Sequence, residues 1–212
     1  MSDIADDARF WDRIARKYAA HKIGDVVGYE RTLERTRHYL GGHEQAFEFG
    51  CGTGTTALKL APSVAHITAT DISGEMIKIA REKARTEGHG NVTFEVMRPE
   101  SAPWPGESFD VVFGFNVLHL VPDCAEVLKS VHRLLRPGGL FISKTPCLTE
   151  MSVLVRFAVP LMRLIGKAPA HVAFFSAEEL EREIAAAGFE IVERARHGSR
   201  GKDFRPFVVA RK

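Results

Sequence analysis

A glycine-rich turn is the first feature of this sequence that could do chemistry. Gly50, Gly52 and Gly54 alternate after a short apolar run, and a helix-compatible stretch, Thr55–Ala61, follows at once. Glycine lets the backbone approach a ligand closely, and a helix start offers unpaired N–H groups and a positive dipole end. Strand, turn and helix together predict the ligand-binding turn of a nucleotide-type α/β fold, although a glycine-rich turn alone is more often only a turn.

Asp71 is the carboxylate best placed to work with this turn. It closes a β-branched run, Ile67–Thr70, downstream of the glycines. An acid at the end of a second strand can accept hydrogen bonds from both hydroxyls of a ribose. The alternative is a helix cap, because Ser73 and Gly74 right behind it could open the next helix. The glycine turn upstream favours the ribose.

Two polar residues at the end of a later apolar run are further candidates for the functional site. Val111–Phe115 is typical of a buried parallel strand, and Asn116 and His119 follow at its carboxyl end, where open α/β sheets bind ligands. His119 is the best candidate for a general base because a histidine side chain titrates near neutral pH. The alternative is a helix-start residue with no catalytic role. The three cysteines show no metal-ligand or disulfide spacing, so we expect no metal site.

These residues need a scaffold of alternating strands and helices. Helices are predicted over Ala8–Ala20, Tyr29–Leu40, Thr55–Ala61 and Glu75–Arg85, from Asp123 towards Pro137–Gly139, and from Ser176 to Gly188. Strands are predicted just before Gly50 and over Ile67–Thr70, Val92–Val96, Val111–Phe115, Leu140–Ser143, Phe189–Glu193 and Phe207–Ala210. The alternation predicts a parallel sheet with helices on both faces. Because no helix separates the last two strands, they should pair antiparallel at the edge of the sheet.

Two segments could cover a ligand from outside this scaffold. The helices within residues 1–42 either pack beside the sheet, which we favour, or form a cap with Tyr18 or Tyr29 facing the ligand. Residues 147–170 are predicted to form one nearly all-apolar helix, kinked or broken at Pro160. Burial within the fold or a homodimer contact through residues 147–165 is the favoured explanation. The alternatives are an insertion, 147–175, that covers an apolar substrate, and a helix that rests on a membrane surface.

Composition bounds the function classes. The chain has 212 residues, of which 45% are hydrophobic, so one domain can bury a full core. Its net charge of +2 is too small to indicate nucleic-acid binding, and the basic stretch Arg194–Arg205 is expected to be a solvated loop. The N-terminus does not fit a signal peptide and no apolar stretch is long enough to span a bilayer, so we expect a cytoplasmic protein.

Two functions fit the glycine turn together with Asp71. One is an S-adenosylmethionine-dependent methyltransferase. The other is an NAD(P)-binding oxidoreductase, because Gly52, Gly54 and Ala57 satisfy the loose dinucleotide pattern G-x-G-x-x-A. A dinucleotide enzyme would continue to a sixth parallel strand and usually needs a second domain for its substrate. This chain shows no second domain and ends in an edge hairpin, which favours the methyltransferase.

Ordered motifs over Phe47–Arg211 carry a family resemblance. The segments concerned are Glu48–Gly54, Asp71, Ser108–Val112, Asn116–His119, Leu135–Gly139 and Ala187–Phe189. In that order they resemble the first motif, the ribose-binding acid, the fourth strand, the turn behind it, and the approaches to the fifth and sixth strands of class I S-adenosylmethionine-dependent methyltransferases. The resemblance implies a Rossmann-like, mainly parallel sheet of seven strands with an antiparallel last strand, and S-adenosylmethionine as cofactor.

The resemblance also implies roles for individual residues. The Gly50–Gly54 backbone should lie against the amino-acid and ribose portions of the cofactor, and Glu48 should orient that turn or the cofactor's amino group. Arg98 departs from the family, which often has an acid there near the adenine. Arginine cannot accept a hydrogen bond, so Glu100, a backbone carbonyl or shape alone must take that role. The predicted cofactor-binding residues are Tyr18, Glu48, Gly50, Cys51, Gly52, Gly54, Asp71, Ile72, Met76, Arg98, Pro99, Glu100, Phe115 and Asn116.

The methyl acceptor is expected to be a small molecule. The apolar stretch 147–165 and the N-terminal aromatic residues favour a partly hydrophobic acceptor, and no aromatic-rich basic groove suggests RNA or DNA. A cofactor-binding protein without transferase activity is the remaining alternative, because family resemblance predicts fold and cofactor better than chemistry.

Overall fold

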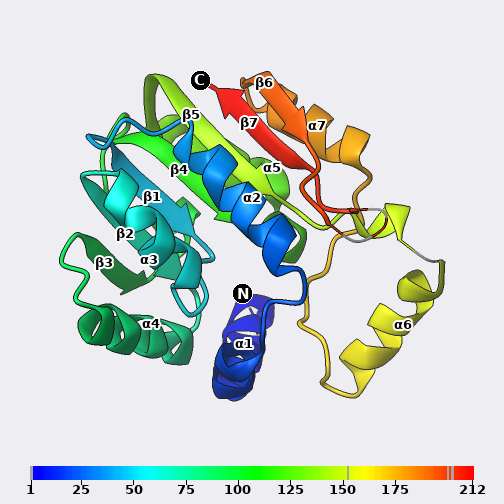
Figure 1. The fold of residues 1–212 in the computed structure, drawn as a ribbon. Coiled ribbons are helices and arrows are strands. Elements are labelled where there is room, and N and C mark those ends of the chain that lie inside the picture. The colour runs from blue at the N-terminus through cyan, green and yellow to red at the C-terminus, as the bar shows by residue number, and fades with distance from the viewer. Residues whose placement is uncertain (1, 152, 200, 202) are drawn as a thin grey trace.

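A seven-stranded sheet forms the centre of the molecule (Figure 1). The computed structural model describes residues 2–151, 153–199, 201 and 203–212. The sheet order is β3-β2-β1-β4-β5-β7-β6, in which β1 to β5 pair in parallel and β7 pairs antiparallel with both β5 and β6. The strands are β1 (Gln45–Phe49), β2 (His66–Asp71), β3 (Val92–Val96), β4 (Phe109–Phe115), β5 (Leu135–Lys144), β6 (Glu190–Ala195) and β7 (Phe207–Arg211). The predicted fold class is confirmed.

Helices cover both faces of this sheet because its strands are apolar on both sides. In β1, Ala46 packs in one core cluster while Phe47 and Phe49 pack in the other. The first cluster is covered by α2 (Val26–Arg37), α3 (Thr55–Leu60) and α4 (Gly74–Glu87). The second is covered by α5 (Cys124–Leu134) and α7 (Ala177–Ala186). In the described part of the chain, short 3₁₀ turns lie at Ala61–Ser63, Pro99–Ser101, Leu118–Leu120 and Leu148–Glu150.

Side-chain caps fix where these helices begin. Ser73 Oγ accepts a hydrogen bond from the Met76 N–H group at 3.1 Å and caps α4. Ser176 and Glu179 form the predicted reciprocal capping box at the start of α7. Each such cap stabilises its helix by about 1 kcal/mol. Because Ser73 caps α4, the carboxylate of Asp71 is left for another role.

The C-terminal hairpin brings a loop to the carboxyl end of the sheet. The chain leaves β6, the edge strand, and returns as β7 beside β5, as the lack of an intervening helix predicts. The Cys147 N–H group donates to the Phe204 carbonyl at 2.8 Å, which ties the loop before β7 to the chain after β5. In this region Arg194 forms an ion pair with Glu181, Arg196 with Glu150, and Arg205 with Asp203.

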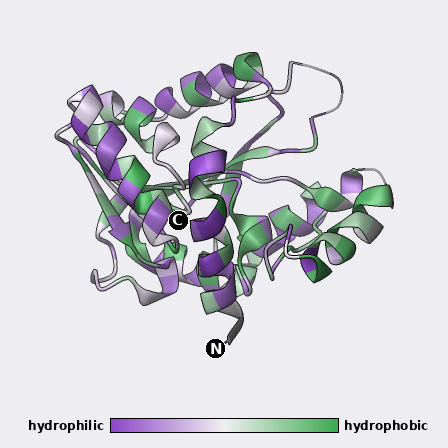
Figure 2. Cartoon of the chain, turned by 90° about the horizontal axis from the view of Figure 1, so that it is seen from below, coloured by the Kyte–Doolittle hydropathy of each residue, from purple (hydrophilic) through white to green (hydrophobic). Residues whose placement is uncertain are grey.

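The region 147–170 departs from the sequence prediction. A single helix from residue 147 to 170 is wrong: after the 3₁₀ turn the helix is α6 (Val153–Leu164), and it continues through Pro160. Gly166 ends it in a left-handed conformation (φ 66°), with the Lys167 N–H group bonded to the Met162 carbonyl at 2.8 Å. Burial within the fold is also wrong, because Leu164 is 84% exposed. Figure 2 shows the hydrophobic colouring of α6 at the side of the molecule. A homodimer through this face stays a prediction.

The N-terminal helix α1 (Ser2–Ala20) stands apart from the sheet and joins two other parts of the chain. Asp12 Oδ1 accepts hydrogen bonds from Ser73 Oγ at 2.6 Å and from the Glu75 N–H group at 3.0 Å, at the start of α4. At the other side, Asp7 accepts from the Ala170 N–H group at 2.6 Å. The second N-terminal helix, α2, packs beside the sheet through buried residues including Leu33. Among the described helices, none combines the length and apolar character needed to cross a bilayer.

Other predicted boundaries shift by a few residues. The helix α5 ends at Leu134, and β5 already begins at Leu135, before the predicted stop at Pro137–Gly139. Leu135 pairs with Phe109, and the register then shifts so that Leu140 pairs with Val111. The Pro-Gly-Gly segment is therefore an irregularity within a strand and not the end of the helix.

Candidate functional site

Two adjoining pockets lie where β1, β2 and β4 end. They share Tyr18, Gly50, Gly52, Phe115 and Asn116, so they form one continuous cleft. The first pocket is the one that Asp71 and Met76 line. It extends towards β3 and α4, whereas the second extends under α2 to the end of β5. We call their union the cleft.

The glycine turn exposes its backbone to the cleft at one position. Gly52 has a φ of 54°, and a Cβ atom added there would meet only a Tyr18 ring carbon at 3.7 Å. A Cβ atom on Gly54 would instead lie 2.8 Å from Ala80 and Phe94. Gly54 lines neither pocket and is required by packing, whereas Gly52 leaves space that a ligand can fill.

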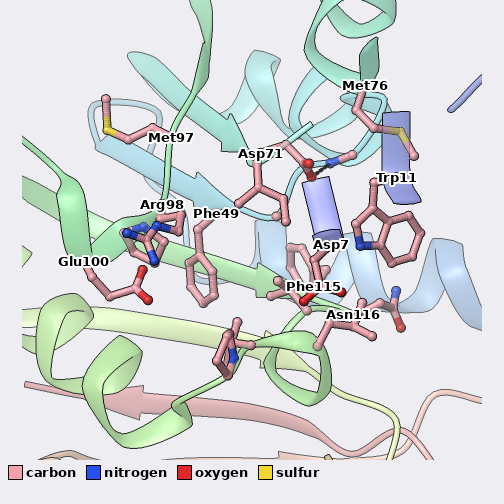
Figure 3. Close-up of a pocket in the computed structure, with 18 of the residues that line it drawn as sticks. Asp7, Trp11, Phe49, Asp71, Met76, Met97, Arg98, Glu100, Phe115 and Asn116 are labelled. Atoms are coloured by element: carbon pink, nitrogen blue, oxygen red, sulfur yellow. Dashed lines mark hydrogen bonds between the residues drawn. The ribbon is translucent and has the colours of Figure 1, made fainter. Parts of the chain in front are cut away.

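Asp71 fastens the glycine turn to the start of α4. Its Oδ2 accepts from the Gly52 N–H group at 2.9 Å, and its Oδ1 accepts from the Ser73 N–H group at 2.9 Å. Burial nevertheless raises the pKa of this carboxyl group, against the effect of those hydrogen bonds. Each carboxylate oxygen keeps a further lone pair. Figure 3 shows Asp71 at the wall of the first pocket, so hydroxyl donors in that pocket can reach it.

Glu48 is a buried acid in the wall of the cleft. It comes from β1, lines the second pocket and is only 2% exposed. Its Oε2 atom has no hydrogen-bond partner among the described residues. Burial, together with the negative charge of Asp71, raises the pKa of Glu48 to about 8. Buried polar groups are almost always paired, so this one indicates a site for a cationic donor.

The far end of the first pocket is built by the turn after β3. Arg98, Pro99 and Glu100 line it, together with Ile72 and Met76. The Met97 N–H group donates to the Asp71 carbonyl at 3.0 Å, which holds this turn against β2. Arg98 and Glu100 both lie in the pocket wall in Figure 3. An apolar slot beside a carboxylate suits a flat base with an amino group.

The comparisons with known proteins agree with this geometry. Residues 41–195 match the family described as "Methyltransferase domain". The chain belongs to this family. It is 30% identical over 208 residues to the demethylmenaquinone methyltransferase of Geobacillus kaustophilus, which covers 85% of this chain and 88% of that one. It is also 30% identical to the ubiquinone biosynthesis O-methyltransferase of Aeromonas salmonicida, with 85% and 76% covered.

A solved structure has a similar fold. The YcgJ protein of Bacillus subtilis superposes with a TM-score of 0.67 at 26% identity, over 78% of this chain and 72% of that one. The protein is a class I, S-adenosylmethionine-dependent methyltransferase. The alternative of an NAD(P)-binding oxidoreductase is set aside.

The cofactor fits the residues of the methyltransferase cleft. The orphaned Oε2 of Glu48 suits the ammonium group of the cofactor's amino-acid portion, and the bare backbone at Gly52 leaves room beside it. Of the predicted cofactor-binding residues, all but Gly54 line one or both pockets.

In the methyltransferase, His119 lies outside the cleft. It lies in the 3₁₀ turn Leu118–Leu120 and lines a third pocket, with Leu148, Met151 and Phe204 among the other residues, and neither pocket of the cleft. Burial lowers the pKa of His119 to about 4, so the side chain is neutral at pH 7 and is a weak base. His119 thus lines the third pocket and not the cleft, and its role as a general base stays a prediction.

Several cleft residues of the methyltransferase were not predicted. Asp7 and Trp11 of α1 line the first pocket, and Lys144 and Arg205 line the second. Helical periodicity could not place Asp7 and Trp11, because it gives a face but not its partner. The sequence did hold a signal for Lys144, because this lysine stands at the carboxyl end of an otherwise apolar strand, where ligands bind.

A matched pair of glycine variants separates binding from folding in this methyltransferase. We expect Gly54→Ala to lower the free energy of unfolding by about 2–4 kcal/mol, because its methyl group overlaps Ala80 and Phe94. Gly52→Ala should cost about 1 kcal/mol through its positive φ, yet weaken cofactor binding at least about tenfold. Urea denaturation and calorimetric titration with S-adenosylmethionine measure the two effects. Equal losses of stability in both variants would contradict the assignment.

Proposed function

We propose that this methyltransferase transfers a methyl group from S-adenosylmethionine to a small, partly hydrophobic acceptor. The observation that carries the proposal is the cleft itself, in which the orphaned Glu48 carboxyl, the bare Gly52 backbone and Asp71 lie on neighbouring strand ends. The Glu48 carboxyl suits an ammonium group, the Gly52 backbone allows a ligand to approach closely, and Asp71 can accept hydrogen bonds from hydroxyl groups.

The adenosine portion belongs in the first pocket under this proposal. Asp71 would accept hydrogen bonds from the ribose, Ile72 and Met76 would pack on the adenosine, and Arg98–Glu100 would neighbour the base. The cofactor's amino-acid portion belongs by Glu48 and the Gly50–Gly52 backbone. Bound there, its sulfonium supplies an already activated methyl group. The protein then mainly needs to align a nucleophile and exclude water.

The acceptor would enter from the second pocket and the third pocket next to it. The two share Asp25 and Arg205, and their walls include Ile23, Leu33 and Phe115 in one and Phe204 in the other. Both curated relatives are named for small molecules, demethylmenaquinone in one case and ubiquinone biosynthesis in the other. Apolar walls and these names support a small, partly hydrophobic acceptor.

Two experiments test the proposal. Calorimetric titration with S-adenosylmethionine and with NAD in parallel should give binding of the first alone. A radiolabel methyl-transfer screen across small metabolites and lipids should then find an acceptor. Activity on protein or RNA only would contradict the acceptor class, and tight cofactor binding without turnover on any extract would favour a binding protein without catalysis.

We also infer a cytoplasmic location for the protein. Cys51, Cys124 and Cys147 are free thiols, and Cys51 and Cys147 are buried, which suits a reducing compartment. Fractionation of cells that produce the protein would test this location.

A further inference from the structure

Lys144 is a buried lysine that reaches the cleft at the level of the glycine turn. It closes β5, is only 6% exposed, and lines the second pocket together with Gly50, Gly52 and Asn116. The Asn116 N–H group donates to the Lys144 carbonyl at 2.7 Å, so the two strand ends lie side by side. Asn116 itself is held with a φ of 55°, a conformation that costs energy and is often found at functional sites.

The partners of Lys144 leave its ammonium group incompletely satisfied. Lys144 Nζ donates to Thr32 Oγ1 at 2.9 Å and lies 3.5 Å from Asp203 Oδ2, well beyond the 2.7–2.9 Å of a good charge-assisted hydrogen bond. Asp203 is also shared, because it accepts from the Gly198 N–H group at 2.8 Å and from Arg205 Nε at 3.1 Å. No acceptor for the third N–H of Lys144 is found among the described residues.

We propose that Lys144 is the residue that meets the methyl acceptor, and that the acceptor reacts through an acidic hydroxyl group, of a phenol or an enol, held as its anion against Lys144 Nζ. The proposal rests on the proposed function, because it places the donor methyl group in the same cleft. The hydroxyl oxygen would take the place of the missing acceptor of Lys144. The apolar walls of the second and third pockets would hold the rest of the molecule.

The chemistry of this step balances without a further reactant. The acceptor hydroxyl gives its proton to the amine form of Lys144, which becomes an ammonium group paired with the acceptor oxyanion. The oxygen then forms its bond to the methyl carbon as the carbon–sulfur bond breaks, and the electron pair of that bond stays on sulfur. The proton finally leaves Lys144 Nζ for solvent.

The charges around Lys144 suit this exchange. Burial lowers the pKa of Lys144, Asp203 and Asp25 oppose that effect, and Arg205 adds to it. His197 also faces this network, since its Nδ1 lies 3.1 Å from Thr32 Oγ1, and the pKa of His197 is lowered, mainly by burial. Glu48 and Tyr29 line the same pocket. A lysine whose pKa approaches that of a phenol exchanges a proton with it efficiently, whereas a carboxylic acid is already ionised and needs no base.

An optical titration tests, without turnover, whether Lys144 holds an acidic hydroxyl group as its anion. The wild-type protein is saturated with S-adenosylhomocysteine, the demethylated product, and 4-nitrophenol or 4-nitrocatechol is added, since the phenolates of both absorb visible light. We expect the bound phenol to ionise at least about one pH unit lower than the free one. An unshifted ionisation of the bound phenol, or no binding of either probe, would overturn the proposal.

Variants of Lys144 test whether this residue causes the shifted ionisation of the bound phenol. Lys144→Met should lose the shift and bind the phenolate at least about 30-fold more weakly, while it keeps its affinity for S-adenosylhomocysteine. Lys144→Arg should keep most of the phenolate affinity. The control Lys59→Met, which removes an ammonium group bonded to Glu30 outside the cleft, should behave as wild type.

The outcomes also separate this inference from the proposed function. Wild-type protein that fails to bind S-adenosylhomocysteine at all contradicts the proposed function. Normal binding of that nucleoside with an unshifted phenol in both wild type and Lys144→Met contradicts only the role of Lys144. A preference for 4-nitrobenzoate over both phenols would overturn the choice of a hydroxyl acceptor.

Discussion

Replacing Glu48 with glutamine should stabilise the ligand-free methyltransferase and at the same time weaken its binding of S-adenosylmethionine by about 100-fold. The carboxyl group is buried and its Oε2 atom lacks a donor, so the folded protein suppresses its ionisation. Glutamine has nearly the same shape and carries no charge. It removes that cost, and it also removes the charged partner for the cofactor's ammonium group, worth about 2–3 kcal/mol.

The pH dependence of this effect has a definite sign. The pKa of Glu48 rises from 4.5 to about 8 on folding, so its contribution to stability is fully present below pH 4.5 and is lost as the pH rises towards 8. Relative to Glu48→Gln, the wild type should therefore lose stability across that window, by roughly 3 kcal/mol at pH 7. Cofactor affinity of the wild type should rise over the same window.

Urea denaturation at pH 5 and pH 8, without ligand, measures the stability difference, and calorimetry at both values measures the affinity. The exposed Glu126 offers a matched control, because Glu126→Gln changes the same atoms in the first turn of α5. A Glu48→Gln protein less stable than wild type at pH 8 would show that the carboxylate has an internal partner in solution.

Replacing Asp71 with alanine should reduce the affinity for S-adenosylmethionine by about 100- to 1,000-fold. The change removes the proposed acceptor of the ribose hydroxyl groups and also the bonds that hold Gly52 and Ser73. Charge-assisted hydrogen bonds of this kind are worth about 1.5–3 kcal/mol each. Calorimetry measures the loss of affinity. Thermal unfolding of the ligand-free variant measures how much stability is lost with the bonds to Gly52 and Ser73.

A change in the ligand isolates the ribose contact from the structural role of Asp71. The 2′-deoxy form of S-adenosylhomocysteine should bind the wild type more weakly than the parent compound, because it lacks one donor. In Asp71→Ala the two ligands should bind almost equally, since the acceptor is gone. An undiminished preference for the parent compound in the variant would mean that another residue holds the ribose.

Much of the fold could be predicted because local signals agree with the overall topology. The alternation of apolar strands with capped helices determines a parallel sheet, and the lack of a helix between β6 and β7 determines an antiparallel pair. The position of Asp71 followed in the same way, because the end of a second parallel strand must lie beside the glycine turn. These inferences depend on neighbours in the chain and on the regular geometry of a sheet.

The rest depended on contacts that no local pattern records. The polar stripe of residues 147–167 indicated a helix with an apolar side, but whether another surface covers that side is a property of the whole fold. His119 follows β4 closely, yet the 3₁₀ turn directs it to a different pocket. Lys144 and Arg205 meet only because the hairpin returns β7 beside β5. The sequence alone could not predict that these two side chains would line the same pocket.

The attachment of α1 places its side chains beside the cleft. None of the described residues of α1 belongs to the two core clusters, and its links at Asp7 and Asp12 are polar contacts to the chain after α6 and to the start of α4. Ala15 of the same helix is fully buried, so α1 is held by apolar packing as well as by these polar contacts. Because Asp7 and Trp11 of α1 line the first pocket, this helix forms part of the wall of the cleft and is held there from two sides.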